Sequence, residues 1–127
     1  MAKKHYTEWG KVFARLRIMY SETLKQQSQR LGFNNMYISF IQNGRKIVTP
    51  QVYESVIEHY PLSDEDKAIL MRGMISDDDV KRFRSVFGAD VDNGKITVPD
   101  MVYILTGYKE TRKRIIKELY ETKAENK

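Results

Sequence analysis

The stretch that decides the fold is Ser21-Glu-Thr-Leu-Lys-Gln-Gln-Ser-Gln-Arg-Leu-Gly-Phe-Asn-Asn-Met-Tyr-Ile-Ser-Phe-Ile-Gln-Asn-Gly-Arg-Lys46. Two short helices are expected in it. Thr23, followed three residues later by glutamine, is a capping-box pattern, and Gly32 suits the position just past a helix end. Asn34 can cap a second helix, which stops at Asn43-Gly44. Because only about three residues join these helices, they must cross steeply, as in a helix-turn-helix motif.

Helical periodicity continues on both sides of this stretch. Apolar residues at the i, i+3, i+4, i+7 spacing predict a first helix over 7–20 with Thr7 as its N-cap. Thr49-Pro50 begins a fourth helix that Pro61 ends, and Ser63 begins a fifth with acidic residues in its first turn. Five helices over roughly 7–75 can share one core. The expected core residues of these helices include Leu16, Leu31, Ile38 and Ile41.

The pattern restarts beyond Gly73. Ser76 and three following Asp residues predict a sixth helix with Val80, Phe83, Val86 and Phe87 on one stripe and its end at Gly88. A polar loop over 89–95 and a seventh helix from Thr97 should follow, and a last helix should begin after Gly107. The predicted fold class is therefore all-α. A five-helix domain would occupy 1–75, and a small helical extension for dimerisation or partner binding would occupy 76–127.

Composition and charge narrow the function further. The 127 residues include no Cys, which excludes disulfides and Cys-ligated metal sites. No apolar run approaches the length of a membrane span, and the first residues have no signal-peptide pattern, so a cytoplasmic location is expected. Residues 1–46 hold nine Lys and Arg against two Glu, or +7, while the whole chain is +5. This asymmetry indicates a phosphate-bearing partner for the N-terminal part, with a solvated basic face as the alternative.

The quoted stretch and the helices that follow it resemble the Xre/Cro class of phage-repressor-type helix-turn-helix domains. The resemblance covers about residues 10–72. Two positions depart from the pattern, since Gln27 stands where the family usually has an apolar residue and Ser28 where it has Ala. The matching elements are Leu31-Gly32 at the turn, Ile38-Ser39 and Ile41 in the helix, Asn43-Gly44-Arg45-Lys46 after it, the helix led by Pro50, and Tyr60-Pro-Leu-Ser-Asp-Glu-Asp-Lys67.

This resemblance implies that the helix after Asn34 lies in the major groove of B-DNA. The side-chain amide of Asn35 can form hydrogen bonds with adenine, and Phe40 can lie against a thymine methyl. The implied function is that of a sequence-specific double-stranded DNA-binding transcriptional regulator of bacterial or phage type, acting as a repressor at the nucleoid. The base-reading residues would be Asn35, Met36, Ser39 and Phe40. The DNA-backbone contacts would be Thr23, Lys25, Gln26, Tyr37, Asn43, Arg45 and Lys46.

An alternative function follows from the apolar side chains on this helix. Met36 and Phe40 would equally suit a protein partner, and a fold does not fix a function. The chain would then be a protein-interaction module, antitoxin-like or inhibitor-like, from a mobile element. Repressor-type domains read two half-sites as dimers, so a homodimer is expected. The candidate dimer or partner contacts are Ile115, Ile116, Leu119 and Tyr120, unless that helix only packs on its neighbours.

Residues 89–100 look like an EF-hand loop, but their spacing is imperfect. With Gly94 at loop position 6, Ala89 and Val91 fall where oxygen ligands are needed, and a start at Asp90 places the glycine one position early. The alternative is a tight Asp-Asn-Gly turn between two helices. We expect no metal and no cofactor. Without a Cys nucleophile or a Gly-rich phosphate loop, and with His5 and His59 in separate segments, the chain is not expected to be an enzyme.

Overall fold

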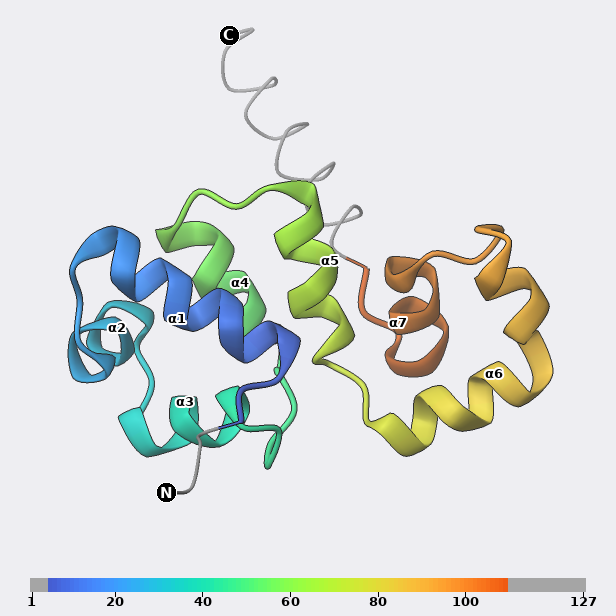
Figure 1. The fold of residues 1–127 in the computed structure, drawn as a ribbon, viewed down its shortest axis with the longest axis horizontal. Helices are drawn as coiled ribbons and strands as arrows, with labels where there is room; N and C mark the ends of the chain where they lie inside the picture. The colour runs from blue at the N-terminus through green and yellow to red at the C-terminus, as the bar shows by residue number, and fades with distance from the viewer. Residues whose placement is uncertain (1–4, 110–127) are drawn as a thin grey trace, which may run out of the picture.

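A computed structural model describes residues 5–109, which form seven α-helices and no strand (Figure 1). The all-α prediction is confirmed, and each of the first five predicted helices is present within one or two residues of its expected bounds. The helices are α1 (Glu8–Tyr20), α2 (Leu24–Leu31), α3 (Asn35–Gln42), α4 (Pro50–His59), α5 (Asp64–Arg72), α6 (Asp77–Asp92) and α7 (Val98–Thr106).

Local capping explains where α2 and α3 begin and end. Thr23 Oγ1 accepts a hydrogen bond from the Gln26 N–H, and Gln26 Oε1 accepts one from the Thr23 N–H, which completes the capping box. Gly32 follows α2 with φ +85°, a conformation that suits glycine, and Asn34 then caps α3. In Figure 1, α2 is seen nearly end-on while α3 lies across the view. The short turn therefore sets the two helices across each other, as the sequence predicts.

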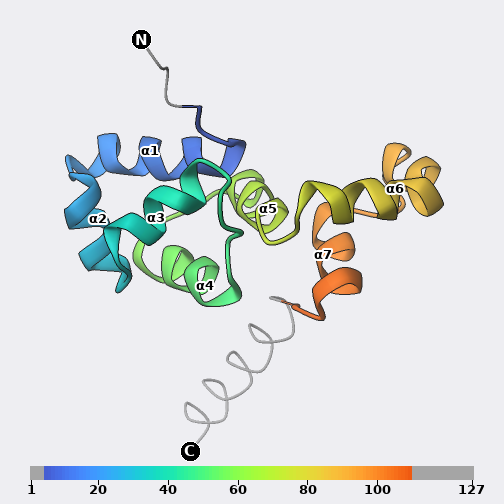
Figure 2. The same cartoon turned by 90° about the horizontal axis from the view of Figure 1, so that it is seen from below.

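The core draws side chains from all seven helices. The predicted core residues of the first helices are buried, and Phe83 of α6 with Met101 and Val102 of α7 join the same cluster. In Figure 2, α5 lies between the group α1–α4 and the pair α6–α7, and α7 packs against α5. The apolar core is thus continuous across residue 75, where the sequence places a domain boundary. That division stays a prediction.

A second cluster, of polar and aromatic side chains, ties the end of α4 to α2. Tyr60 is buried and donates its hydroxyl to Glu22 Oε2 at 2.6 Å, while Arg30 pairs with the other oxygen of the same carboxylate. The Arg30 guanidinium lies 5.5 Å from the ring centres of both Tyr20 and Tyr60. Burial, together with the Glu22 carboxylate, raises the pKa of Tyr60 to about 12. These contacts to the Glu22 carboxylate therefore hold α2 against the end of α4.

The C-terminal end of α3 is fixed to the start of α1. The Thr7 N–H and hydroxyl donate to the Gln42 carbonyl at 2.9 and 3.0 Å, and Trp9 Nε1 donates to the Ile41 carbonyl at 2.9 Å. These bonds satisfy carbonyls that the end of a helix leaves unpaired. The two helices cross at Gly10, where a Cβ atom would lie 2.2 Å from the Gln42 carbonyl oxygen. Only glycine fits this crossing without displacing α3.

The sixth helix agrees with its prediction in part. Its predicted end at Gly88 lies next to a break in the helix, since Phe87 has non-helical φ and ψ of −116° and 16°. Beyond this kink, helical conformation resumes and continues to Asp92, and the left-handed glycine that follows is Gly94, at φ +81°. Of the expected apolar stripe, Phe83 is buried, but Val86 is 71% exposed and Phe87 is exposed as well. The predicted loop over 89–95 therefore begins only after Asp92.

The same helix argues against the EF-hand interpretation of residues 89–100. Its last turn holds Ala89 to Asp92 in helical conformation, so these residues do not form the start of a ligand loop. Asp100 closes a capping box with Thr97, and the hydrogen bonds it accepts there lower its pKa. In the range 5–109 no cluster of three or more His, Asp or Glu is placed to hold a metal. The segment is the Asn-Gly turn between two helices that the alternative described.

Two further expectations concern the ends of the chain and its surface. Ile115, Ile116, Leu119 and Tyr120, predicted for dimer or partner contact, lie outside the described residues. At the surface, Met19 and Tyr20 are both exposed at the C-terminal end of α1, although their spacing continues the apolar period of that helix. None of the helices within 5–109 combines the length and the apolar character needed to cross a membrane.

Candidate nucleic-acid interface

Helix α3 has one buried and one outward face. Ile38 and Ile41 are fully buried in the core. Asn35 and Met36 are exposed in the first turn, Met36 to 64%, and Ser39 and Phe40 lie half-buried one turn later. These four residues share a face because they are spaced i, i+1, i+4 and i+5. The structure thus brings the four predicted base-reading residues together, and their role in reading bases stays a prediction.

Two cations directly after α3 lie over aromatic rings. The Arg45 guanidinium carbon is 5.8 Å from the ring centre of Phe40, and Lys46 Nζ is 5.8 Å from the ring centre of Tyr37. Tyr37 in turn packs edge-on against Phe33, with ring centres 5.9 Å apart. Contacts of this kind hold a cation by the negative face of the ring. Phe40 and Tyr37 therefore support the two charges, which sequence reasoning did not anticipate.

The turn at Asn43-Gly44 fixes the backbone that carries these cations. Asn43 Oδ1 accepts a hydrogen bond from the Arg45 N–H at 3.2 Å, and Gly44 takes φ +83°. The N–H groups of Arg45 and Lys46 both donate to the Phe40 carbonyl, at 2.9 and 3.2 Å. Because this turn is closed by its own hydrogen bonds, both cations keep a fixed place beside α3.

The start of α2 supplies donors of another kind. Thr23 and Gln26 use their side-chain oxygens to cap each other, while Lys25 is exposed in the first turn. Within 5–109 no group accepts a hydrogen bond from the N–H of Leu24 or Lys25. Unpaired N–H groups and the positive end of the helix dipole together favour an anion at this place. The predicted backbone contacts of α2 thus lie at a helix N-terminus that can accept phosphate.

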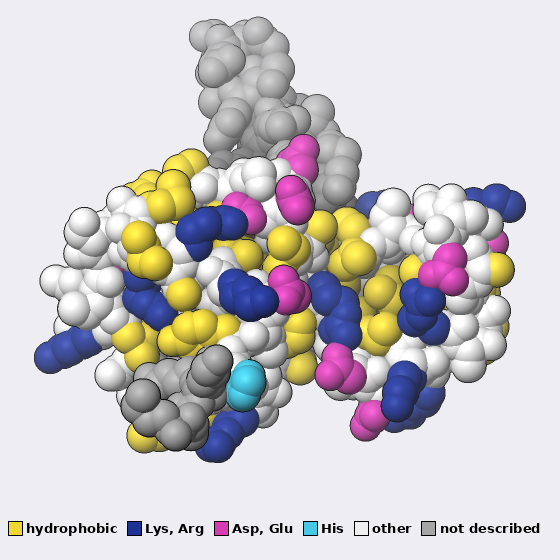
Figure 3. Space-filling view, in the orientation of Figure 1, with side chains coloured by type: hydrophobic (Ala, Val, Ile, Leu, Met, Phe, Trp, Pro, Cys, Tyr) yellow, Lys and Arg dark blue, Asp and Glu magenta, His cyan; other side chains and the backbone are white. Residues whose placement is uncertain are grey.

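The basic side chains around α3 carry charge that nothing nearby neutralises. Lys25, Arg45 and Lys46 have no carboxylate partner among the described residues. The chain has no Asp or Glu between Glu22 and Glu54, and this interval is the sequence signal that could have revealed the imbalance. On the face in Figure 3, acidic and basic side chains alternate over α6.

A buried polar network joins α1, α2 and α3 behind this face. Arg17 Nη1 donates to Gln27 Oε1 at 2.8 Å and also to Gln42 Oε1, and Gln27 Nε2 donates to the Phe13 carbonyl at 3.0 Å. Gln27, which departs from the family pattern, is fully buried and pairs both ends of its amide. Ser28 Oγ is buried with no hydrogen-bond partner in the described part of the chain. Arg17 is therefore held by two amides.

Comparison with known proteins adds no assignment to this surface. No family model, no curated protein and no solved structure matches the chain. The resemblance to repressor-type domains therefore rests on the residues of the sequence, and the case for an interface rests on the side chains around α3.

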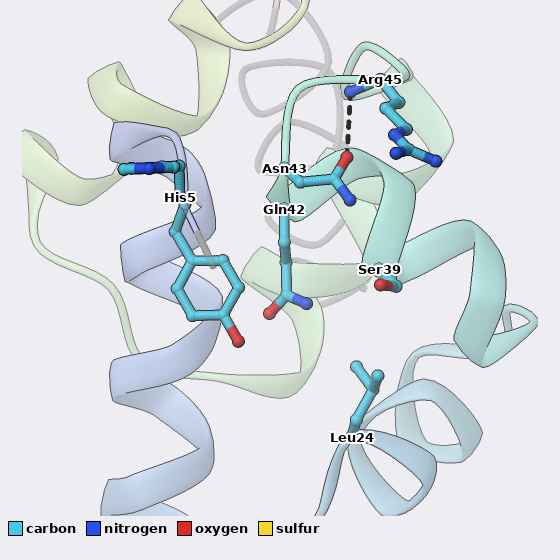
Figure 4. A pocket seen from close by; sticks show the side chains of 7 residues that line it. His5, Leu24, Ser39, Gln42, Asn43 and Arg45 are labelled. Atoms are coloured by element: carbon cyan, nitrogen blue, oxygen red, sulfur yellow. Dashed lines mark hydrogen bonds between the residues drawn. The ribbon is translucent and has the colours of Figure 1, made fainter. Parts of the chain in front are cut away.

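Seven residues near the C-terminal end of α3 line a hollow of about 330 Å³. It lies between the N-terminal segment, the start of α2, the end of α3 and the turn after α3 (Figure 4). Sequence reasoning gave no sign of it, because it forms only where these segments meet. The lining residues are His5, Tyr6, Leu24, Ser39, Gln42, Asn43 and Arg45.

Proposed function

We propose that the chain is a sequence-specific double-stranded DNA-binding transcriptional regulator of bacterial or phage type, with α2 and α3 as a repressor-type helix-turn-helix. One observation carries the proposal. Asn35 is exposed on the outward face of α3, Arg45 and Lys46 lie over Phe40 and Tyr37 of the same helix, and Lys25 is exposed at the start of α2. None of the three cations has a carboxylate partner among residues 5–109. Such a surface complements the phosphates on both sides of a major groove.

The mechanism follows from this arrangement. α3 enters the major groove, and Asn35 in its first turn meets a base edge, where its amide can bond adenine in two places. Arg45 and Lys46 meet phosphates on one side of the groove, and the start of α2 meets phosphates on the other. Because the aromatic rings and the Asn43-Gly44 turn already hold the cations, little side-chain freedom is lost on binding. Occupancy of an operator then represses transcription by blocking polymerase.

The regulator acts as a homodimer in the cytoplasm, at the nucleoid. Two copies of α3 read two half-sites about one turn of DNA apart. The C-terminal part supplies the contact between copies, for which Ile115, Ile116, Leu119 and Tyr120 remain the candidates. The exposed Tyr103, Ile104 and Leu105 of α7 lie within that part and offer further apolar surface.

Selection of duplexes from a random pool tests the proposal. We expect an enriched inverted repeat, bound about 10³-fold or more tightly than scrambled DNA. Asn35→Ala should weaken binding to the selected duplex by about 1–3 kcal/mol and relax the base preference at one position of each half-site. Gln29→Ala, which removes an exposed amide from α2, serves as the control and should leave affinity unchanged. Weak binding without an enriched motif, lost as salt rises, would show only a basic surface.

The exposure of Met36 favours a second candidate function. This apolar side chain stands on the outward face of α3, where it could fill a pocket of a protein partner as readily as touch a base. The chain would then be a protein-interaction module that uses the same helices. The Asn35→Ala measurement separates the two functions, because under the second one the variant binds DNA with the same affinity as the wild type.

A further inference from the structure

The hollow at the C-terminal end of α3 is lined by the side-chain amide of Gln42, whose oxygen accepts from Arg17 and whose nitrogen faces the hollow. Gln42 is only 2% exposed, yet its side chain lines the hollow. Figure 4 shows its amide nitrogen turned toward the side where Ser39 and Leu24 lie. Among the described residues no group accepts a hydrogen bond from Gln42 Nε2. The nitrogen is not among the buried atoms without a partner, so it is accessible from the hollow and can donate to a group that enters it.

The orientation of this amide is fixed by Arg17. The guanidinium can only donate, so the atom of Gln42 that it meets must be the oxygen. The nitrogen is thereby directed into the hollow rather than toward α1. Arg17 has no carboxylate partner within 5–109, and its charge polarises the amide and strengthens Nε2 as a donor. The network behind α3 thus prepares one donor for an acceptor from outside.

The other groups that line the hollow favour an anion with several oxygens. Asn43 uses its oxygen to accept from the Arg45 N–H, which leaves its side-chain nitrogen to donate. The Ser39 hydroxyl supplies a further donor, and Leu24 brings the N-terminus of α2 to the rim. Arg45 also lines the hollow, with its guanidinium over the neighbouring Phe40 ring. No carboxylate lines the hollow. Donors on several sides suit the tetrahedral oxygens of a phosphate group.

We propose that the hollow binds a phosphate group through Gln42 Nε2 and Arg45, and that in the DNA complex this group is a backbone phosphodiester beside α3. The second clause rests on the proposed function. Arg45 and Asn43 are already expected at the DNA backbone, and the new element is Gln42 together with the hollow it faces. The contact also links DNA to α1, because the same amide accepts from Arg17.

Gln42→Glu tests the donor without removing the fold. The new carboxylate keeps the acceptor for Arg17 and gains an ion pair with it, so the melting temperature should stay equal or rise. In the hollow it replaces an N–H donor by a negative charge, and affinity for the selected duplex should fall about tenfold or more. Gln29→Glu adds the same charge at an exposed site of α2 outside the hollow and should change affinity only a few-fold.

Neutral linkages in the DNA locate the contact. In the selected duplex, single phosphodiesters are replaced one at a time by methylphosphonates. The wild-type protein should lose affinity at one linkage beside each half-site, and Gln42→Glu should no longer distinguish that linkage from the native one. If the two proteins respond alike to every linkage, Gln42 does not meet a backbone phosphate and that part of the proposal is overturned.

Titration with inorganic phosphate separates the sources of the ligand and needs no variant. The NMR signals of the Gln42 side-chain amide in the wild-type protein should shift with phosphate and with the selected duplex. A shift with phosphate alone, and no effect of Gln42→Glu on DNA, supports a site for free phosphate and overturns the backbone contact. No shift with either overturns the site. If no duplex is selected, the proposed function fails, and the phosphate titration still decides about the hollow.

Discussion

Two turns in this chain have the same local structure and different surroundings. Asn43-Gly44 follows α3 and Asn93-Gly94 follows α6, and the glycines take φ +83° and +81°. In each turn the asparagine oxygen accepts from the N–H two residues later, at 3.2 Å from Arg45 and 3.1 Å from Lys95. Each turn leads to a helix that begins at a capping threonine with a proline in its first turn. Local sequence alone accounts for this likeness.

The surroundings of the two turns differ in tertiary contacts and in charge. A Cβ atom at Gly44 would lie 3.0 Å from Thr7 Cγ2, because α1 covers this turn, whereas nothing lies within 4 Å of one at Gly94. Arg45 lies over Phe40 with no carboxylate partner among residues 5–109. Beside the second turn, Arg84 pairs with Asp92 at 2.7 Å. The comparison teaches that the turn is a local feature, whereas the candidate site depends on what packs around it.

The largest expected effect comes from separating α1 from α3 where the two helices cross, next to the Asn43-Gly44 turn. Gly10→Ala places a Cβ where the Gln42 carbonyl oxygen lies only 2.2 Å away, so α1 must move off α3 and the hydrogen bonds of Thr7 and Trp9 must weaken. We expect the free energy of unfolding to fall by about 3 kcal/mol, as in overpacked cores. Urea unfolding measures it.

Gly88→Ala is the matched control in the other half of the chain. Nothing lies within 4 Å of a Cβ at Gly88, and its φ is not positive. This variant should be as stable as wild type or slightly more stable, because alanine favours a helix. A Gly10→Ala variant that unfolds at the wild-type urea concentration would show that α1 and α3 are not held together as closely as the structure indicates.

The next effect concerns charge at equivalent positions of the two turns. Arg45→Ala removes a cation without a carboxylate partner in the described range, so affinity for the selected duplex should fall about tenfold and the salt dependence should lose roughly one phosphate contact. Lys95→Ala changes the residue at the same place after the second turn and should leave both quantities unchanged. Fluorescence anisotropy at several salt concentrations measures them. Equal losses in the two variants would mean that net charge, and not the place of Arg45, determines binding.

The sequence could predict features that depend on neighbouring residues. Thr7, Thr23, Asn34 and Thr49 cap the helices that their patterns indicated, because an N-cap bonds to the backbone two or three residues away. The helix end predicted at Gly88 lies next to the kink at Phe87, but a further helical segment follows it. A glycine inside a pattern predicts a helix end only if the chain turns left-handed there, and the residue that does so is Gly94, past the C-cap Asn93.

The sequence could not predict features that form where three helices meet. Arg17, Gln27 and Gln42 lie far apart along the chain, and only the crossing of α1, α2 and α3 makes them partners. The hollow has the same origin, since its walls come from four segments. The support of Arg45 and Lys46 by aromatic rings depends on where the turn places them. By contrast, the absence of Asp and Glu from positions 23 to 53 is visible in the sequence itself.

The smallest expected effects come from removing the asparagine side chain of each turn, and they compare the two turns most directly. Asn43→Ala and Asn93→Ala each remove one hydrogen bond to the backbone, so both should lower the free energy of unfolding by about 0.5–1 kcal/mol. DNA affinity should separate them, because only the first turn carries Arg45 and lines the hollow. Asn43→Ala should weaken binding to the selected duplex several-fold, and Asn93→Ala should not. Urea unfolding and anisotropy on the same two samples give both numbers. Equal stability losses with unequal affinities would mean that one local turn serves structure in both places and recognition in one, whereas equal affinities would remove the Asn43-Gly44 turn from the proposed interface.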